Sequence, residues 1–310
     1  MTVLFTFPGQ GSQRAEMLRT LPDSAVVRET LDEASTVLGH SVVDLDTESA
    51  LSSTVAVQLC LLIAGVAGAR LIESIGGAPD MVAGLSIGAY PAAVTAGILK
   101  FDDAVRLVRR RGALMEHAFP SGYGMMAISG LNQRAVERVV ARVHSETTPV
   151  YLANLNAETQ MVIAGSDAAL AQAGTIALES GARAADRIRV PVPSHCALLA
   201  PAAAELAREF DAVELKRPRL TYLSSSMARS LIDPPKIGAD LAANMAQQVR
   251  WRETMRLAWE RGARLAIEMP TGNVLTRLAG ESFTEGIAIS FSETRPDSIA
   301  TLIERAQEMR

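Results

Sequence analysis

The sequence of 310 residues predicts an α/β fold in which a large domain built on a parallel sheet carries a smaller inserted domain. Segments typical of strands and of helices alternate along most of the chain, and this alternation favours a parallel sheet. The order changes at about Gly122 and returns after Val190. We therefore predict a discontinuous large domain at residues 1–121 and 191–310, and a small domain at residues 122–190.

Apolar runs and helical periodicity mark the elements of the large domain. Before the insertion, they predict strands at Val3–Phe7 and Met81–Leu85 and helices at Thr54–Ile75 and Asp102–Ala118. After the insertion, three further strands are expected at TYLSSS, RLAIEM and GIAISF. A closing helix is expected at residues 296–309.

The inserted segment has a different order of elements. Four short β-like runs, GMMAISG, PVYLAN, TQMVIAG and ARAADRIRV, surround two helix-like runs, NQRAVERVVARVH and DAALAQAGTIALESG. The order βαββαβ is typical of a ferredoxin-like domain. We interpret this segment as a small domain inserted into a larger one.

Composition and charge exclude several classes of protein. The net charge is −4, and the arginines are scattered among carboxylates, so a nucleic-acid partner is not expected. Cys60 and Cys196 form no disulfide framework, which favours a reducing cytoplasm. The apolar run at residues 55–69 is shorter than the roughly 20 residues of a membrane span, so we predict a buried helix and no membrane insertion.

A serine stands between two glycines directly after the strand at Met81–Leu85. The stretch Gly84-Leu85-Ser86-Ile87-Gly88 matches G-x-S-x-G, a strained strand-to-helix turn that exposes the serine oxygen. A serine nucleophile of an α/β-hydrolase-like domain is one interpretation. A purely structural turn is the alternative.

A serine nucleophile requires a base, and the chain has four histidines. His40, His117 and His144 fall in polar or surface-facing positions. His195 follows two prolines in VPVPSHCALL, where Ser194 or His195 is expected to open a helix. Because a helix N-terminus disfavours the imidazolium, we predict that His195 is a neutral general base; a packing role at a helix start is the alternative.

An arginine falls inside the apolar stripe of the helix at Asp102–Ala118. Arg111 is four residues after Leu107 and three after Val108, so its side chain is expected to point into the protein. Such a guanidinium needs an anion. An internal Asp or Glu is one candidate partner, and a substrate carboxylate held by the planar fork is the other.

A glycine loop, Phe7-Pro8-Gly9-Gln10-Gly11-Ser12-Gln13, follows the first strand. Its backbone can turn an N–H group toward an oxyanion, although a plain turn or an anion-binding helix start would also fit. FPGQGSQ, GLSIGAY, RRGALM and VPSHCALL, in this order and at these spacings, resemble the malonyl-CoA:acyl carrier protein transacylases. The resemblance covers essentially the whole chain.

This resemblance implies a role for each motif. It makes Ser86 the nucleophile, His195 the base and Arg111 the clamp for the malonyl carboxylate. It also implies an oxyanion hole formed by the backbone N–H groups of Gln10 and Ile87, and a substrate-side position for Gln58, for which a polar cap on a buried helix is the alternative. Neither a metal nor a cofactor is implied; the substrates are malonyl-CoA and a phosphopantetheine-type thiol on a carrier protein.

The chain departs from the family pattern at several positions. Leu85 and Ala89 replace the usual histidine and glutamate beside the serine. Arg250, in QQVRW, stands where we expect the residue whose backbone carbonyl orients the catalytic histidine. The form GLSIGAYPAAV looks most like the transacylase (epsilon) subunit of malonate decarboxylase, whose carrier subunit bears a modified dephospho-CoA thiol; the alternative is a transacylase of fatty acid synthesis.

Two other functions are compatible with parts of the sequence. A serine thioesterase or hydrolase would need an acidic residue between Ser86 and His195 to complete a triad. A catalytically silent docking subunit would not need Ser86, His195 and Arg111 together. For a carrier protein, the exposed arginines Arg183, Arg187 and Arg189 are candidate contacts, with ordinary solvated charge as the alternative.

Overall fold

The computed structural model describes residues 1–280 and 282–309. Its larger sheet has six strands in the order β10-β9-β1-β2-β7-β8. The neighbouring strands are parallel except β7 and β8, which are antiparallel. The predicted parallel sheet is therefore confirmed, while the short β8 was not predicted. The bounds are β1 Thr2–Phe7, β2 Met81–Gly84, β7 Thr221–Ser224, β8 Arg229–Leu231, β9 Ala263–Glu268 and β10 Ile287–Ser290.

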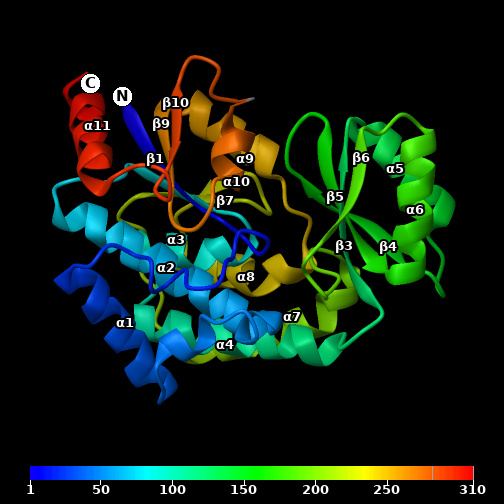
Figure 1. Cartoon of the computed structure of the whole chain (residues 1–310), viewed down its shortest axis with the longest axis horizontal. Helices are drawn as coiled ribbons and strands as arrows, with labels where there is room; N and C mark the ends of the chain where they lie inside the picture. Colours follow the sequence, from blue (N-terminus) through cyan, green and yellow to red (C-terminus); the bar gives the residue numbers. More distant parts are fainter. Residues whose placement is uncertain (281, 310) are drawn as a thin grey trace.

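Helices cover both faces of this sheet (Figure 1). Along β1, Val3, Phe5 and Phe7 pack into the core shared with α1 to α4, whereas Leu4 packs into the core on the side of α9 and α10. The alternation follows from the period of two residues in a strand. The helix bounds are α1 Ala25–Leu38, α2 Thr54–Ser74, α3 Ala89–Thr95, α4 Phe101–Ala118, α7 Ala200–Glu209, α8 Pro234–Ala243, α9 Trp251–Glu260, α10 Val274–Ala279 and α11 Pro296–Glu308.

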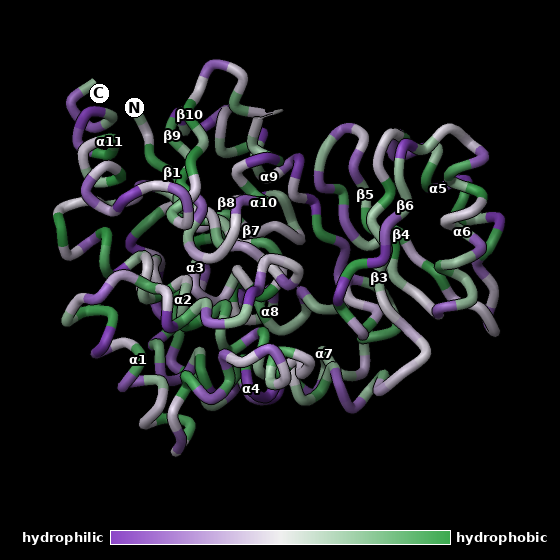
Figure 2. Tube along the Cα trace, in the orientation of Figure 1, coloured by the Kyte–Doolittle hydropathy of each residue, from purple (hydrophilic) through white to green (hydrophobic). Residues whose placement is uncertain are grey.

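Helix α2 is strongly apolar and lies in the centre of the fold. It is long and apolar enough to cross a membrane, but 89% of its apolar window is buried inside the protein. Figure 2 shows α2 and β1 among the strongly apolar parts of the interior. The prediction of a buried helix is confirmed.

The inserted segment forms a second, antiparallel sheet in the order β4-β5-β3-β6. Figure 1 shows this sheet and its two helices gathered to one side of the larger sheet. One face of the small sheet packs on α5 and α6, whereas Met125, Val162 and Ala164 on the other face join the core of the large domain. The bounds are β3 Tyr123–Ser129, α5 Gln133–Val143, β4 Val150–Leu155, β5 Gln160–Ser166, α6 Asp167–Glu179 and β6 Ala184–Ile188.

The turn between β2 and α3 depends on two glycines that have no space for a side chain. A Cβ atom on Gly84 would lie 2.0 Å from the backbone of Gly88, and one on Gly88 would lie 2.1 Å from the carbonyl oxygen of Phe7. The turn can therefore pack directly against the end of β1. This contact fixes the position of the residue between the glycines, Ser86.

We expect Gly84→Ala to lower the free energy of unfolding by about 3 kcal/mol, because the backbone of Gly88 must move to admit the methyl group. Gly181→Ala is the control: Gly181 has a φ of 95° but no neighbour within 4 Å of an added Cβ. The Gly181→Ala variant should lower the free energy of unfolding by only about 1 kcal/mol, because backbone strain is its one effect. Urea denaturation of the two variants checks this, and equal losses would contradict it.

Candidate active site

Ser86 stands at the carboxyl end of β2, as the G-x-S-x-G turn predicts. It begins a short 3-10 helix, Ser86–Gly88, and has a φ of 57°, in the left-handed region that non-glycine residues rarely adopt. Such backbone strain is typical of functional turns. The residue is 7% exposed, and it lines a pocket rather than standing on the surface.

The glycine loop after β1 lies against this turn. A Cβ atom on Gly9 would come within 2.9 Å of the Leu85 carbonyl oxygen, so only glycine permits this approach. The hydroxyl of Ser12 donates a hydrogen bond to the carbonyl of Gly9 at 2.8 Å and holds the loop. The structure thereby brings the loop that contains Gln10 against the turn that contains Ser86, and both residues line one pocket. Ile87 lies in the first helical turn, where backbone N–H groups lack an intrahelical acceptor.

His195 follows the inserted domain in the sequence, and the fold brings its side chain next to Ser86. Its Nε2 lies 2.8 Å from Ser86 Oγ, and its Nδ1 lies 2.8 Å from the carbonyl oxygen of Asn244 and 3.1 Å from that of Gln247. Carbonyl oxygens only accept hydrogen bonds, so Nδ1 carries the proton. Nε2 of the neutral ring is therefore the acceptor that faces the serine hydroxyl.

The prediction that the Arg250 carbonyl orients the histidine is wrong. That carbonyl accepts hydrogen bonds from the N–H of Thr254 at 3.0 Å and from its hydroxyl at 2.9 Å. The reason is that α9 begins at Trp251, so the carbonyl of Arg250 takes the first bond of the helix. The orienting carbonyls belong to the preceding segment, at Asn244 and Gln247.

The prediction that Ser194 or His195 opens a helix is also wrong. His195 has a φ of 65°, and α7 begins only at Ala200 after a short 3-10 turn. The pKa of His195 is nevertheless lowered to about 4, chiefly because the ring is buried and secondly because of the Arg111 charge. The predicted neutral imidazole therefore has a different physical cause.

Arg111 of α4 is completely buried, as the apolar stripe predicts. Its Nη1 donates to Gln58 Oε1 at 2.7 Å, and its Nη2 to Asn244 Oδ1 at 3.1 Å and to Ser86 Oγ at 3.3 Å. All three acceptors are neutral, and among the described residues no carboxylate forms an ion pair with it. Burial lowers its pKa only to about 10, so it remains a cation at neutral pH.

Gln58 of α2 is buried next to this arginine rather than at a helix edge. Its amide nitrogen donates to Gln10 Oε1 at 3.2 Å and to Met115 Sδ at 3.3 Å, while its oxygen accepts from Arg111. The side chain therefore connects the glycine loop to the guanidinium and fixes the direction of Arg111.

Asn244 is a site residue that the sequence did not reveal. Its side-chain oxygen accepts from Arg111, its side-chain nitrogen donates to the Ser86 carbonyl at 3.2 Å, and its backbone carbonyl accepts from His195. It lies in a short 3-10 turn, Asn244–Ala246, within a weakly patterned stretch. No local motif marks it, since its importance comes only from the three residues it contacts.

A pocket of about 200 Å³ opens above Ser86 and His195. The glycine loop forms one wall and the small sheet forms another. The residues contributed by the small domain are Met125, Ala127, Asn154, Asn156, Gln160, Val162, Ile188 and Val190.

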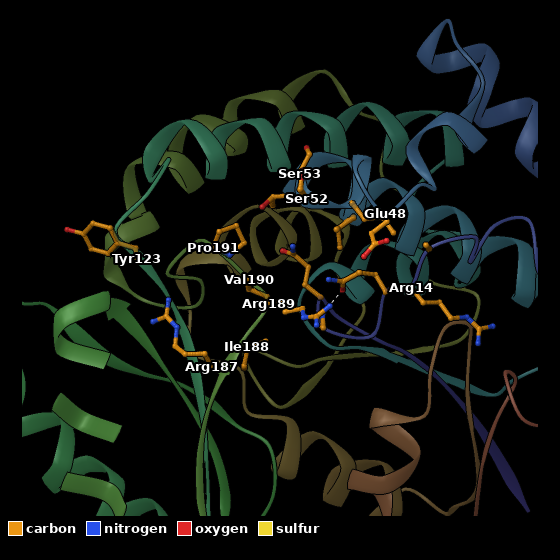
Figure 3. A pocket seen from close by; sticks show the side chains of 17 residues that line it. Arg14, Glu48, Ser52, Ser53, Tyr123, Arg187, Ile188, Arg189, Val190 and Pro191 are labelled. Atoms are coloured by element: carbon orange, nitrogen blue, oxygen red, sulfur yellow. Dashed lines mark hydrogen bonds between the residues drawn. The ribbon is translucent and has the colours of Figure 1, made fainter. Parts of the chain in front are cut away.

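A larger groove of about 1180 Å³ adjoins this pocket and shares Gln10, Gly11, Ile188 and Val190 with it. Figure 3 shows Arg187 and Arg14 on opposite sides of the groove and Arg189 between them. Arg187 forms an ion pair with Asp167 at 2.6 Å. Of the three arginines predicted to meet a carrier, Arg187 and Arg189 line this groove and Arg183 does not.

Comparison with known proteins finds relatives that align with nearly the whole chain. It is 35% identical to the malonyl CoA-acyl carrier protein transacylase of Escherichia coli K12 over 306 residues, which cover 97% of this chain and 98% of the relative. The transacylase of the same name from Bacillus subtilis is also 35% identical, over 310 aligned residues covering 97% of this chain and 98% of the relative.

Solved structures give the same result for the fold. The malonyl CoA-acyl carrier protein transacylase of Coxiella burnetii superposes with a TM-score of 0.92 at 35% identity, covering 98% of both chains. A malonyl-transacylase solved in complex with a type II PKS acyl-carrier protein superposes with a TM-score of 0.91 at 35% identity, covering 98% of this chain and 100% of that chain.

These similarities extend over both sheets of the structure. The α/β fold class predicted from the sequence is confirmed. The sequence matches the acyl transferase domain over residues 4–308, and the chain therefore belongs to the acyl transferase domain family.

Proposed function

We propose that this protein is a malonyl-CoA:acyl carrier protein transacylase that transfers malonyl groups through a malonyl-serine intermediate. The observation that carries the proposal is the buried Arg111, which has only neutral partners and lies 3.3 Å from Ser86 Oγ. A buried charge without a counter-ion is costly, so a ligand that brings a carboxylate to this position is favoured. The carboxylate of a malonyl group has the required charge beside the reacting carbonyl.

In the first half-reaction, the Ser86 hydroxyl attacks the thioester carbonyl and His195 Nε2 accepts its proton. The 2.8 Å contact between these atoms permits direct transfer. The backbone N–H groups of Gln10 and Ile87 are proposed to hold the oxyanion, since both belong to turns that face the serine. His195 then donates the proton to the departing thiolate of coenzyme A, which leaves Ser86 malonylated.

In the second half-reaction, the thiol of the carrier takes the place of coenzyme A. His195 removes the thiol proton, the thiolate attacks the malonyl-serine ester, and Ser86 recovers its proton from His195. The same groups act in reverse order, so the reaction follows a ping-pong scheme. No metal or redox cofactor takes part in this proposal, and we place the reaction in the cytoplasm, where free Cys60 and Cys196 are stable.

A serine hydrolase is the less favoured alternative. His195 Nδ1 faces two backbone carbonyls, Asn244 and Gln247, and within the described part of the chain no carboxylate bonds to it. The proposed carrier would approach through the large groove, where Arg189 offers positive charge to an acidic partner and Arg187 is already paired with Asp167. A silent docking subunit would have no use for a buried arginine beside a paired serine and histidine.

We further propose that the acceptor is the carrier subunit of malonate decarboxylase. The support is the sequence GLSIGAYPAAV, in which Leu85 and Ala89 match the form of that system's transacylase subunit. Fatty acid synthesis is the alternative. Transfer assays with carriers bearing either the modified dephospho-CoA group or phosphopantetheine distinguish the two, and a preference for the second carrier would reject the decarboxylase assignment.

We expect brief exposure to malonyl-CoA to add one malonyl group to Ser86, detected by intact-protein mass spectrometry and peptide mapping. Ser86→Ala should show no adduct, because it removes the attacking oxygen. Steady release of coenzyme A without an adduct would favour a hydrolase. Neither adduct nor release would favour a silent docking subunit.

We expect Arg111→Met to lower the rate of malonylation from malonyl-CoA by about 100-fold or more, because the substrate carboxylate loses its charged partner. Acetylation from acetyl-CoA, which has no carboxylate, should change far less. Arg110→Met is the matched control, since Arg110 is exposed and pairs with Glu205 and Glu209. Equal losses for malonyl-CoA and acetyl-CoA would contradict the proposed clamp.

We expect kcat/KM for malonylation to stay nearly constant as the pH is lowered to about 5, because the pKa of His195 is lowered from 6.5 to about 4. Below its pKa the ring is protonated and cannot accept the serine proton, so the rate falls with falling pH. Arg111→Met should move this acidic limb to higher pH because the arginine charge lowers the histidine pKa. A limb at pH 6.5 in the unaltered protein would contradict this assignment.

A further inference from the structure

The glycine loop after β1 is not held in place by secondary structure. Strand β1 ends at Phe7 and helix α1 begins at Ala25, and residues 8–24, all within the described part of the chain, contain no helix or strand. The proposed oxyanion hole nevertheless needs the backbone N–H of Gln10 in one fixed direction. Contacts with other side chains must therefore set the direction of this N–H group.

A side chain of the loop itself sets the direction of the Gln10 N–H group. The hydroxyl of Ser12 donates a hydrogen bond to the carbonyl oxygen of Gly9 at 2.8 Å. This carbonyl and the N–H of Gln10 belong to the same trans peptide group, which is planar and keeps the two groups pointing in opposite directions. The hydrogen bond from Ser12 therefore fixes the N–H of Gln10 together with the Gly9 carbonyl.

Ser12 is held in turn by a buried threonine from a distant part of the chain. The hydroxyl of Thr271 donates to the Ser12 carbonyl oxygen at 2.5 Å. Thr271 is 1% exposed, so its hydroxyl is shielded from bulk water. A Cβ atom added to the next residue, Gly272, would lie 3.4 Å from the Cβ of Ser12. The segment around Thr271 therefore packs directly against the glycine loop.

The segment that follows β9 is fixed to both strands that flank β9 in the large sheet. On one side, the N–H of Met269 donates to the carbonyl of Thr6 in β1 at 2.8 Å. On the other side, the N–H of Gly272 donates to Ser292 Oγ at 3.0 Å, and the hydroxyl of Ser290, at the end of β10, donates to the Gly272 carbonyl. The threonine between these anchors is therefore held by the sheet, and it transmits that fixed position to the loop.

We propose that Thr271 is a positioning residue of the reaction, which acts through Ser12 to aim the Gln10 N–H at the oxyanion. This inference rests on the proposed function, because that function places Gln10 in the oxyanion hole. Negative charge develops on the carbonyl oxygen only when Ser86 attacks, so Thr271 affects the acylation rate and not the binding of the thioester. Every acyl thioester forms the same oxyanion. The effect of Thr271 is therefore independent of the substrate carboxylate, unlike that of Arg111.

The test is Thr271→Val in the complete protein, which removes the hydroxyl and nearly keeps the shape of the side chain. Single-turnover acylation of Ser86 by malonyl-CoA and by acetyl-CoA gives a maximal rate and a half-saturating concentration for each. The maximal rate should fall about tenfold or more, by the same factor for both thioesters, because the oxyanion loses an aligned donor. The half-saturating concentration should stay within about twofold.

Two further variants follow the hydroxyl along the chain of hydrogen bonds. Thr271→Ser keeps the donor and should restore the maximal rate to within about threefold of the unaltered protein. Ser12→Ala removes the next donor and should reproduce the loss on both thioesters. Because Ser12 lies in a partly exposed loop, this variant tests the proposal even if Thr271→Val does not fold.

Thr30→Val is the matched control. Thr30 is equally buried, and its hydroxyl donates to the Val26 carbonyl at 2.8 Å within α1. This variant should leave both acylation rates unaffected. Equal rate losses in Thr30→Val and Thr271→Val would show a general effect of a lost buried hydroxyl and would overturn the proposal. A rise in the half-saturating concentration alone, a loss confined to malonyl-CoA, or no rescue by Thr271→Ser would overturn it as well.

Failure of the proposed function has a different signature. If the unaltered protein is malonylated but Thr271→Val and Ser12→Ala lose no rate, only the positioning inference fails. If neither thioester acylates the unaltered protein, the transacylase proposal fails. The rate at which a fluorophosphonate modifies Ser86 then tests the inference, because this reaction also places negative charge on an oxygen beside the serine. A slower reaction in Thr271→Val but not in Thr30→Val would support the positioning role, and equal rates would overturn it.

Discussion

The buried positive charge of Arg111 is the constraint around which the site is arranged. The guanidinium is completely enclosed, yet its partners Gln58, Asn244 and Ser86 are neutral. These hydrogen bonds fix the direction of the guanidinium but leave its charge uncompensated. A buried uncompensated charge destabilises the folded state, so a purely structural role does not explain it. The same charge helps to keep His195 unprotonated, because it opposes a second positive charge nearby. One residue thus places a positive charge in the pocket and favours the neutral form of the histidine.

Two strained backbone positions meet at the reacting atoms. Ser86 and His195 both have positive φ values, at 57° and 65°, a conformation that costs about 1–3 kcal/mol per residue. Contacts from elsewhere hold them there. The close approach of Gly84, Gly88 and the end of β1 fixes the serine turn, and the N–H of His195 donates to the Met245 carbonyl. The strain is therefore maintained by the large domain.

The small domain completes the pocket from the other side. Its β4–β5 hairpin is hydrogen-bonded to Val249, close to the carbonyls that orient His195. A shift of this domain would therefore change the pocket wall and the histidine environment together. This coupling gives a physical reason for an insertion that contributes neither the serine nor the histidine.

Local patterns by themselves determined a large part of this protein. The apolar run before Gly84, the glycine spacing around Ser86 and the stripe containing Arg111 predicted a strand, a strained turn and a buried cation, because each depends on neighbours within a few residues. Tertiary structure decided the rest. The importance of Asn244, the carbonyls that hold His195 and the burial that lowers its pKa all arise from segments far apart in the chain. Their contacts have no period or spacing in the sequence, so only the folded chain could determine them.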